Sequence, residues 1–373
     1  MARCSGPYRR GGGSCRPSRG SRRSGRGDPS HDRAGMSLDL IPYDLPLRSP
    51  MATSHAIVAN RRGALVRLDD HGTIGWGDLC PMPGWSVQEF ESLHDQVDMA
   101  GLRLDEDMIG DVLDTLVGAP EARAGLAGAA ADVLAQEAGL SLAAHLAPEP
   151  LERVAVNATI GAADVSTALT NVYLAIANGI ETIKLKVAHR RVEEDIALVE
   201  SARRAVGDKV ELRLDANGGW RPDEALEILH RLAPLDIAVC EEPTAGIDQI
   251  AAVGAESPVP VAVDESARTV DDLRRAIATG TVAAVVIKPQ ALGGPDFAMQ
   301  AIAAAHSAGV TPIVTSMIDS AVGVAHAVHV AAASGVTAAH GVATSALLAT
   351  DVAAPLPVED GAILVPSIPG LGV

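Results

Sequence analysis

Apolar and polar residues alternate along three stretches between residues 38 and 78, which read LDLIPYDLPL, HAIVANRRGALVRLDD and TIGWGDL. Alternation with a period of two predicts β-strands, and the turn residues between the stretches predict a meander. Helical spacing of apolar residues follows in SVQEFESLHDQVDMA and in the Ala-rich ARAGLAGAAADVLAQEAG. A meander followed by helices predicts an α+β domain over residues 36–130.

The pattern changes near residue 152, where short runs rich in β-branched residues begin, each followed by a helical stretch. The runs are VAVNA, TIKLKV, VELRLDA, IAVCE, VPVAVDE, AAVVIKP and TPIVTS. Strands that alternate with helices predict a parallel sheet. About eight such units fit between residues 152 and 345, which favours a closed barrel over an open sheet. We therefore expect a barrel domain over residues 131–350 and a C-terminal segment, residues 351–373, that packs on the first domain.

Composition supports a parallel α/β protein. Hydrophobic residues make up 47% of the chain and aromatic residues only 2%, so Ala, Val, Leu and Ile must build the core. The net charge of −17 argues against nucleic acid as a ligand. The four cysteines show no CxxC or zinc spacing, which fits a reducing compartment. Because no apolar run reaches the roughly 20 residues that span a bilayer, we expect a cytoplasmic enzyme without a membrane partner.

The first 35 residues differ in composition from the rest of the chain. They are rich in Arg, Gly and Ser, with nine Arg against two Asp. Such a segment buries too little apolar surface to order itself, so we expect a disordered basic tail. A nucleic-acid-binding arm and a transit peptide share this composition. We favour a natural start at Met36, with residues 1–35 not native, which the intact mass of the native protein would test.

Charged residues end five of the predicted barrel strands, in the order Lys186, Asp215, Glu241, Asp264 and Lys288. The carboxyl ends of barrel strands meet on one face, where active sites lie. Three carboxylates brought together repel one another unless a cation neutralises them. Hard oxygen ligands on rigid strands suit Mg²⁺. The pattern therefore predicts a magnesium site formed by the three carboxylates.

Lysines flank these carboxylates on both sides. Lys184 and Lys186 are two residues apart in IKLKV and so share one face of their strand, and Lys288 follows the last carboxylate. A lysine beside a divalent cation should have a depressed pKa, and a lysine that is neutral near pH 7 is a usable base. A single charged residue at a strand end is usually solvated. Five in series, each ending a buried strand, favour a common site, because charges are rarely buried without a partner.

Five motifs resemble the successive strand ends of the enolase superfamily, in its muconate-lactonizing subgroup. They are KLK at 184–186, LDAN at 214–217, CEEP at 240–243, VDES at 263–266 and IKPQALGG at 287–294. The resemblance covers the chain from Met36 to Val373. It implies an α/β fold, in which an N-terminal α+β capping domain covers a (β/α)7β TIM-like barrel and the substrate lies between them.

The resemblance also implies roles for the charged residues. Asp215, Glu241 and Asp264 would bind Mg²⁺, with Mn²⁺ as a possible substitute, and Glu241 is chosen over Glu242 because the family's ligand lies two residues before the proline. Lys186 and Lys288 would be the catalytic residues, on opposite faces of the substrate.

Three further segments resemble the o-succinylbenzoate synthases of that subgroup. They are GWGDLCPMPGWSVQEFE (75–91), RSPMATSHAIVANRRGALVRL (48–68) and TSMIDSAVG (315–323). This implies a lyase of menaquinone biosynthesis that dehydrates 2-succinyl-6-hydroxy-2,4-cyclohexadiene-1-carboxylate to 2-succinylbenzoate. Lys186 would remove the proton α to the carboxylate and return it to the departing hydroxyl, while Lys288 would remain an ammonium ion. The partner expected is a small-molecule carboxylate, and a homo-oligomer is left open.

Other residues are expected to contact the substrate or to support those that do, namely Lys184, Asn217, Ser316 and Asp319. Asp319 stands where many relatives of the subgroup carry Glu, so its part as a partner of Lys288 is open. His340, at the start of HGVATSALL, is better explained as a structural residue than as a catalytic one.

Three alternatives compete with the lyase. An N-succinylamino acid racemase or a dipeptide epimerase of the same fold would use the same two lysines, although dipeptide epimerases typically show a DxD at the eighth strand, which HGVATSA lacks. A Schiff-base aldolase on a TIM barrel would use Lys288 as its nucleophile but would leave the three carboxylates unexplained. A non-enzymatic binding protein would be expected to have lost at least one of the five strand-end residues.

Overall fold

The structure is a computed structural model that describes residues 35–52, 57–104, 108–161 and 164–373. Apart from Gly35, the predicted basic tail lies outside these residues, so its disorder and its non-native origin stay predictions.

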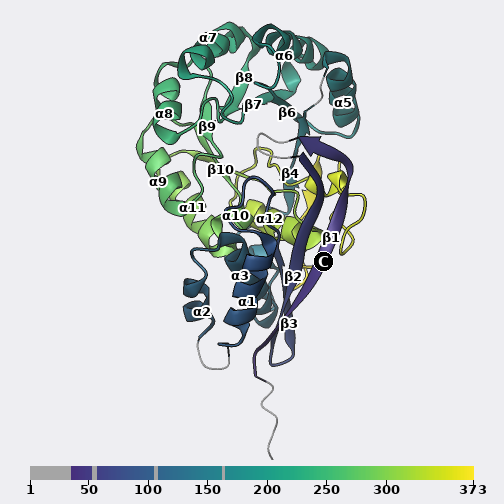
Figure 1. The fold of residues 1–373 in the computed structure, drawn as a ribbon. Coiled ribbons are helices and arrows are strands. Elements are labelled where there is room, and N and C mark those ends of the chain that lie inside the picture. Colours follow the sequence, from purple (N-terminus) through teal and green to yellow (C-terminus); the bar gives the residue numbers. More distant parts are fainter. Residues whose placement is uncertain (1–34, 53–56, 105–107, 162–163) are drawn as a thin grey trace, which may run out of the picture. The chain divides into compact units, whose positions relative to one another are not determined.

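The described part of the chain begins with an antiparallel sheet followed by helices, as the sequence predicts. The elements are β1 Ser37–Ala52, β2 Ile57–Asp70, β3 Thr73–Leu79, α1 Phe90–Gly101, α2 Ile109–Thr115 and α3 Pro120–Glu137. The strands pair in the order β1-β2-β3 (Figure 1). The short helix α2 was not predicted, because its seven residues bury only Val112 and so show no helical period.

Helix α3 is almost entirely buried, and it packs against β3 at very short range. A Cβ atom added to Gly77 would lie 1.8 Å from the carbonyl oxygen of Gly125, and one added to Gly75 would lie 2.1 Å from that of Ala129. Glycine is therefore needed at both positions of β3, since any side chain would push the helix off the strand.

Seven parallel strands form the second sheet. They are β5 Asn157–Ile160, β6 Thr182–Lys186, β7 Glu211–Asp215, β8 Ile237–Glu241, β9 Val261–Val263, β10 Ala284–Ile287 and β11 Thr311–Val314. They pair in chain order, from β5 at one edge to β11 at the other. Parallel bridges from Val156 to His340 and from Thr315 to Gly341 join the two edges. Residues 340–341 thus take the eighth position and close the predicted barrel.

Helices follow the barrel strands, and those from α5 to α9 lie along the outer side of the barrel (Figure 1). The helices that follow the strands are α5 Val165–Ala177, α6 Val192–Val206, α7 Pro222–Leu232, α8 Ile247–Glu256, α9 Val270–Ala278, α10 Pro289–Leu292, α11 Pro295–Ser307 and α12 Ala321–Ala333. The remaining elements are α4 Leu142–Leu146, β4 Arg153–Ala155, β12 Val358–Glu359 and β13 Ala362–Leu364, with 3₁₀ turns at Gly207–Lys209, Ala233–Leu235 and Thr344–Leu347.

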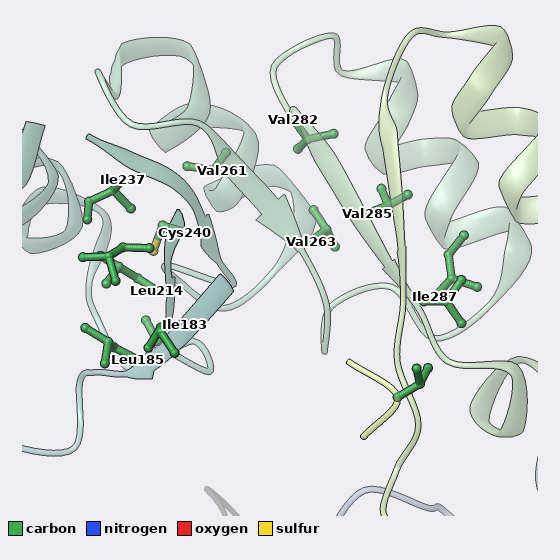
Figure 2. Close-up of a cluster of buried hydrophobic side chains, with 14 of the residues drawn as sticks. Ile183, Leu185, Leu214, Ile237, Cys240, Val261, Val263, Val282, Val285 and Ile287 are labelled. Atoms are coloured by element: carbon green, nitrogen blue, oxygen red, sulfur yellow. The ribbon is translucent and has the colours of Figure 1, made fainter. Parts of the chain in front are cut away.

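The main hydrophobic core lies between the barrel strands and their helices. Figure 2 shows Ile183 and Leu185 of β6 and Leu214 of β7 in this cluster. Because side chains alternate along a strand, Lys184 and Lys186 point to the side of the sheet opposite to Ile183 and Leu185. Lys184 and Lys186 are therefore directed to the inside of the barrel, away from the apolar core.

The C-terminal segment, residues 351–373, contacts both the first region, which holds β1–β3 and α1–α3, and the region that holds the barrel. β13 pairs with β4, the backbone N–H of Leu371 donates to Asp132 of α3, and the Leu371 carbonyl lies 2.9 Å from Nε2 of His329 in α12. The domain boundaries expected from the sequence stay predictions.

Candidate active site

Three carboxylates meet at the carboxyl ends of neighbouring barrel strands. Asp215 ends β7, Glu241 ends β8, and Asp264 follows β9 by one residue. One oxygen from each lies within 4.8 Å of the others, and all three side chains are buried. The register of the parallel strands aligns them, because Asp215 is paired with Glu241 across β7 and β8. The structure thus brings together the three carboxylates that the sequence predicts.

Three lysines surround this carboxylate cluster. Nζ of Lys184 lies 2.6 Å from Oε2 of Glu241 and 3.3 Å from Oδ2 of Asp215. Nζ of Lys186 lies 2.7 Å from the same Asp215 oxygen. From the other side Nζ of Lys288, one residue beyond β10, lies 2.5 Å from Oδ1 of Asp264. The two lysines predicted to be catalytic therefore approach opposite ends of the carboxylate row.

Mutual attraction of these charges controls the protonation of the buried groups. Burial by itself raises the pKa of Asp215, but the ammonium groups of Lys186 and Lys184 outweigh it and hold that pKa below its ordinary value. Burial by itself lowers the pKa of Lys184, yet Glu241 and Asp215 outweigh it and raise that pKa. Asp264 does the same for Lys288. A depressed pKa is expected for lysines that lie beside a bound divalent cation. That expectation stays a prediction.

The carboxylate cluster fits a hard divalent cation. Its donors are all oxygen atoms, they come from rigid strand ends, and they are buried at one point. Burial, together with the neighbouring Asp215 and Asp264, raises the pKa of Glu241 against the opposing effect of Lys184. A cation would relieve this repulsion among like charges. The cluster could therefore hold a metal ion.

Asn217 connects Lys186 to a fourth acidic side chain. Its Oδ1 accepts a hydrogen bond of 2.8 Å from Lys186, and its Nδ2 donates one of 2.7 Å to Oε1 of Glu265. Burial, together with Asp264, raises the pKa of Glu265 to about 7. The sequence prediction included Asn217 but missed Glu265, although the pair of adjacent acids in VDES could have pointed to it.

Glu242, the second acid of CEEP, is turned away from the carboxylate cluster. Its backbone adopts a left-handed φ of 42°, and its carboxylate accepts hydrogen bonds from the backbone of Asp264 and from the hydroxyl of Ser266. Glu242 therefore supports the loop that carries Asp264, and the cluster contains Glu241 instead.

The first region of the chain contributes Trp85, which was not predicted from the sequence. Nζ of Lys288 lies 3.9 Å from the centroid of the indole ring, a cation–π distance. Arg268 also faces this ring and donates a hydrogen bond of 2.9 Å to the Trp85 carbonyl. The loop that follows β3 therefore covers one of the two predicted catalytic lysines.

Arg61 of β2 anchors that loop. Its fully buried guanidinium donates to the carbonyls of Cys80 and Pro81 in the loop and to the carbonyl of Ile318 after β11. Ile318 has a φ of 59°, which is strained for a β-branched residue. Hydrogen-bond anchors of this kind join segments far apart in sequence, so they leave no local pattern from which to predict them.

The remaining predicted residues lie near the barrel mouth in supporting positions. The hydroxyl of Ser316 bonds to that of Thr344, and the Asp319 carboxylate accepts from the backbone N–H of Met317 rather than from Lys288. Burial raises the pKa of Asp319 to about 6, against the opposing charge of Arg61. Both ring nitrogens of His340 face backbone groups, those of Val314 and Val336, which agrees with a structural histidine.

None of the helices in the described part of the chain has the length and apolar character needed to cross a bilayer.

Family models match both regions of the chain. Residues 36–131 match a family described as "MenC, N-terminal domain", and residues 167–373 match "Enolase C-terminal domain-like". The second match alone covers more than half of the chain.

The individual relatives have several different activities. The chain is 30% identical to the L-Ala-D/L-Glu epimerase of Bacillus subtilis over 88% of this chain and 93% of the relative. It is 35% identical to the o-succinylbenzoate synthase of Thermobifida fusca over 48% of this chain and 56% of the relative. A muconate lactonizing enzyme from Pseudomonas fluorescens has the same fold, with a TM-score of 0.84 at 22% identity over 91% of this chain and 96% of that one. The chain belongs to the enolase superfamily, and its fold is the TIM-like barrel of these enzymes.

Proposed function

We propose that this protein is an o-succinylbenzoate synthase, a magnesium-dependent lyase of menaquinone biosynthesis. Its reaction is the dehydration of 2-succinyl-6-hydroxy-2,4-cyclohexadiene-1-carboxylate to 2-succinylbenzoate. The observation that carries this proposal is the match of residues 36–131 to the MenC N-terminal domain. This region supplies Trp85 beside Lys288, so it lies next to the proposed chemistry. The o-succinylbenzoate synthase relatives add support.

The reaction begins with the removal of a weakly acidic proton α to a carboxylate. Lys186 takes this proton, and the electrons of the broken C–H bond move into the enediolate. A Mg²⁺ ion held by Asp215, Glu241 and Asp264 would stabilise the negative charge that develops on the carboxylate oxygens. Lys288, held as an ammonium ion by Asp264 and the face of Trp85, adds positive charge from the opposite side.

The second step breaks the C–O bond of the ring hydroxyl. Lys186 returns its proton to the departing hydroxide, so water leaves and the lysine is regenerated. The electrons of the enediolate form the last double bond of the aromatic ring, whose stability drives the reaction forward. Asn217 holds Nζ of Lys186 at 2.8 Å, which keeps this group on the same face for both proton transfers. Lys184 bridges Glu241 and Asp215 and would hold the metal ligands in place.

An N-succinylamino acid racemase or a dipeptide epimerase is the alternative. The 30% identity to an L-Ala-D/L-Glu epimerase favours it, and two lysines on opposite faces suit proton exchange equally well. Against the dipeptide epimerase, residues 340–346 read HGVATSA and lack the DxD that would bind a substrate ammonium group.

A direct assay separates these activities. Purified protein is incubated with the cyclohexadiene substrate and Mg²⁺, with and without a chelator, beside a racemisation assay on N-succinyl amino acids and dipeptides. We expect chelator-sensitive formation of 2-succinylbenzoate. Racemisation or epimerisation without dehydration would contradict the lyase and establish the alternative.

Variants of the two lysines test the assigned roles. Lys186→Ala and Lys288→Ala should each lower turnover by roughly 100-fold or more, since each removes a group that acts in the transition state. Lys209→Ala, at an exposed position of a 3₁₀ turn, is the matched control and should keep full activity. Circular dichroism would check that the fold is intact. Full activity in either active-site variant would refute the roles proposed here.

A further inference from the structure

A small cavity lies where α3, α10 and α12 meet, between the first region and the barrel. The residues that line it include Asp78 near the end of β3, Gln290 of α10, Asp319, and Gly323 and His326 of α12. Its volume is about 10 Å³. A cavity needs roughly 10–15 Å³ on this measure to hold one water molecule. The cavity is therefore large enough for one water molecule and too small for an organic ligand.

Three of these lining residues carry a buried polar atom without a hydrogen-bond partner among the described residues. The atoms are Oδ1 of Asp319, Nε2 of Gln290 and Nδ1 of His326. The exposed fractions of the three residues are 2%, 6% and 6%. An unpaired buried polar group costs about 1–3 kcal/mol, and such groups are rare in native proteins. Three around one cavity indicate a shared partner.

The hydrogen-bonding capacities of these atoms match those of one water molecule. Nε2 of His326 lies 2.8 Å from the carbonyl of Trp76, so it carries the proton and Nδ1 is an acceptor. Oδ1 of Asp319 is a second acceptor, and the amide nitrogen of Gln290 is a donor. A water molecule that donates to the two acceptors and accepts from the amide would satisfy all three atoms.

A metal cation fits the same cavity poorly. Divalent cations need about six oxygen ligands. The two Asp78 oxygens already accept hydrogen bonds from the hydroxyl of Tyr43 and the backbone N–H of Ser320. The other atoms include a nitrogen donor, which a cation repels. We propose that this cavity binds one ordered water molecule, which bridges Asp319, His326 and Gln290.

This bridge would position the segment that carries Lys288. Gln290 is two residues after Lys288, in a helix of only four residues that starts at Pro289. Asp319 lies in the loop after β11, which Arg61 and Asp78 hold from the first region. The water molecule thus links α10 to a firmly anchored loop and to α12. This positioning role rests on the proposed function, whereas the water site itself does not.

A crystal structure of the full-length protein, at a resolution that shows ordered solvent, tests the site. We expect one solvent peak within hydrogen-bond distance of all three atoms. An empty cavity, or side chains that turn to bond one another directly, would overturn the proposal. A crystal soaked in Rb⁺ separates water from a cation, since an anomalous peak in the cavity would also overturn it.

The variant Gln290→Leu tests the positioning role, because it removes the donor and keeps the volume nearly constant. We expect kcat to fall by roughly 3- to 100-fold with KM little changed, as for a slightly misplaced catalytic group. Gln96→Leu in α1 is the matched control and should leave kcat unchanged. An unchanged kcat in Gln290→Leu, with the wild-type protein active, would refute the positioning role and leave the proposed function standing.

Discussion

Arg61 provides a sharp test of how the first region is held on the barrel. Its guanidinium is fully buried and donates to three backbone carbonyls, those of Pro81 at 2.7 Å, Cys80 at 2.9 Å and Ile318 at 3.0 Å. Arg61→Met keeps most of the side-chain volume but removes all three donors. The variant therefore isolates the hydrogen bonds from the packing.

The expected loss follows from these three carbonyls. Each unsatisfied buried acceptor costs about 1–3 kcal/mol. Part of this free-energy cost is offset, because the variant no longer has to bury the charge of the guanidinium. We therefore expect Arg61→Met to lower the free energy of unfolding by about 3–5 kcal/mol. The loop that carries Trp85 should loosen at the same time, because Arg61 bonds two of its carbonyls.

Urea unfolding followed by tryptophan fluorescence and circular dichroism measures this loss. The neighbouring Arg62→Met is the matched control, since the Arg62 side chain is 57% exposed and pairs with exposed Glu91. An exposed ion pair contributes only about 0–1 kcal/mol. If Arg61→Met destabilises the protein no more than Arg62→Met does, the reasoning about the buried carbonyls is wrong.

Three further predictions concern metal binding, acid stability and close packing. Asp264→Asn should weaken Mg²⁺ binding by roughly 10-fold or more in calorimetric titrations, whereas Asp223→Asn, in the first turn of α7, should not change it. Burial lowers the pKa of His340 to about 4, below the unfolded value of about 6.5. Between these two pH values the unfolded state binds more protons than the folded state, so the free energy of unfolding falls as the pH falls. His340→Gln should therefore lose less stability than the wild type between pH 6.5 and 4.5, by about 2 kcal/mol in urea unfolding at each pH. Equal slopes in the two proteins would contradict this. Gly77→Ala should destabilise the protein by roughly 2–3 kcal/mol or more, because its Cβ would lie 1.8 Å from a backbone oxygen, whereas Gly110→Ala, with open space around it, should stabilise helix α2 by about 0.5–1 kcal/mol, as thermal unfolding would show.

The sequence by itself determined the strands of the barrel and the members of the carboxylate cluster. Runs of β-branched residues marked the barrel strands, because strand periodicity is a local property of the chain. Asp215, Glu241 and Asp264 could be selected because each stands at a strand end, and the ends of parallel strands meet on one face of a barrel. A prediction of this kind needs short-range patterns and one rule of topology, and the choice of Glu241 over Glu242 also used the resemblance to the enolase superfamily.

Only the tertiary structure decided which groups touch these residues. Trp85 lies over Lys288 although about 200 positions separate them, and Arg61 bonds Ile318 across a separation of 257. The same holds for Glu242, which the loop geometry turns away from the carboxylate cluster. Such contacts depend on how separate elements pack in three dimensions, and packing at this range leaves no periodic signal along the chain.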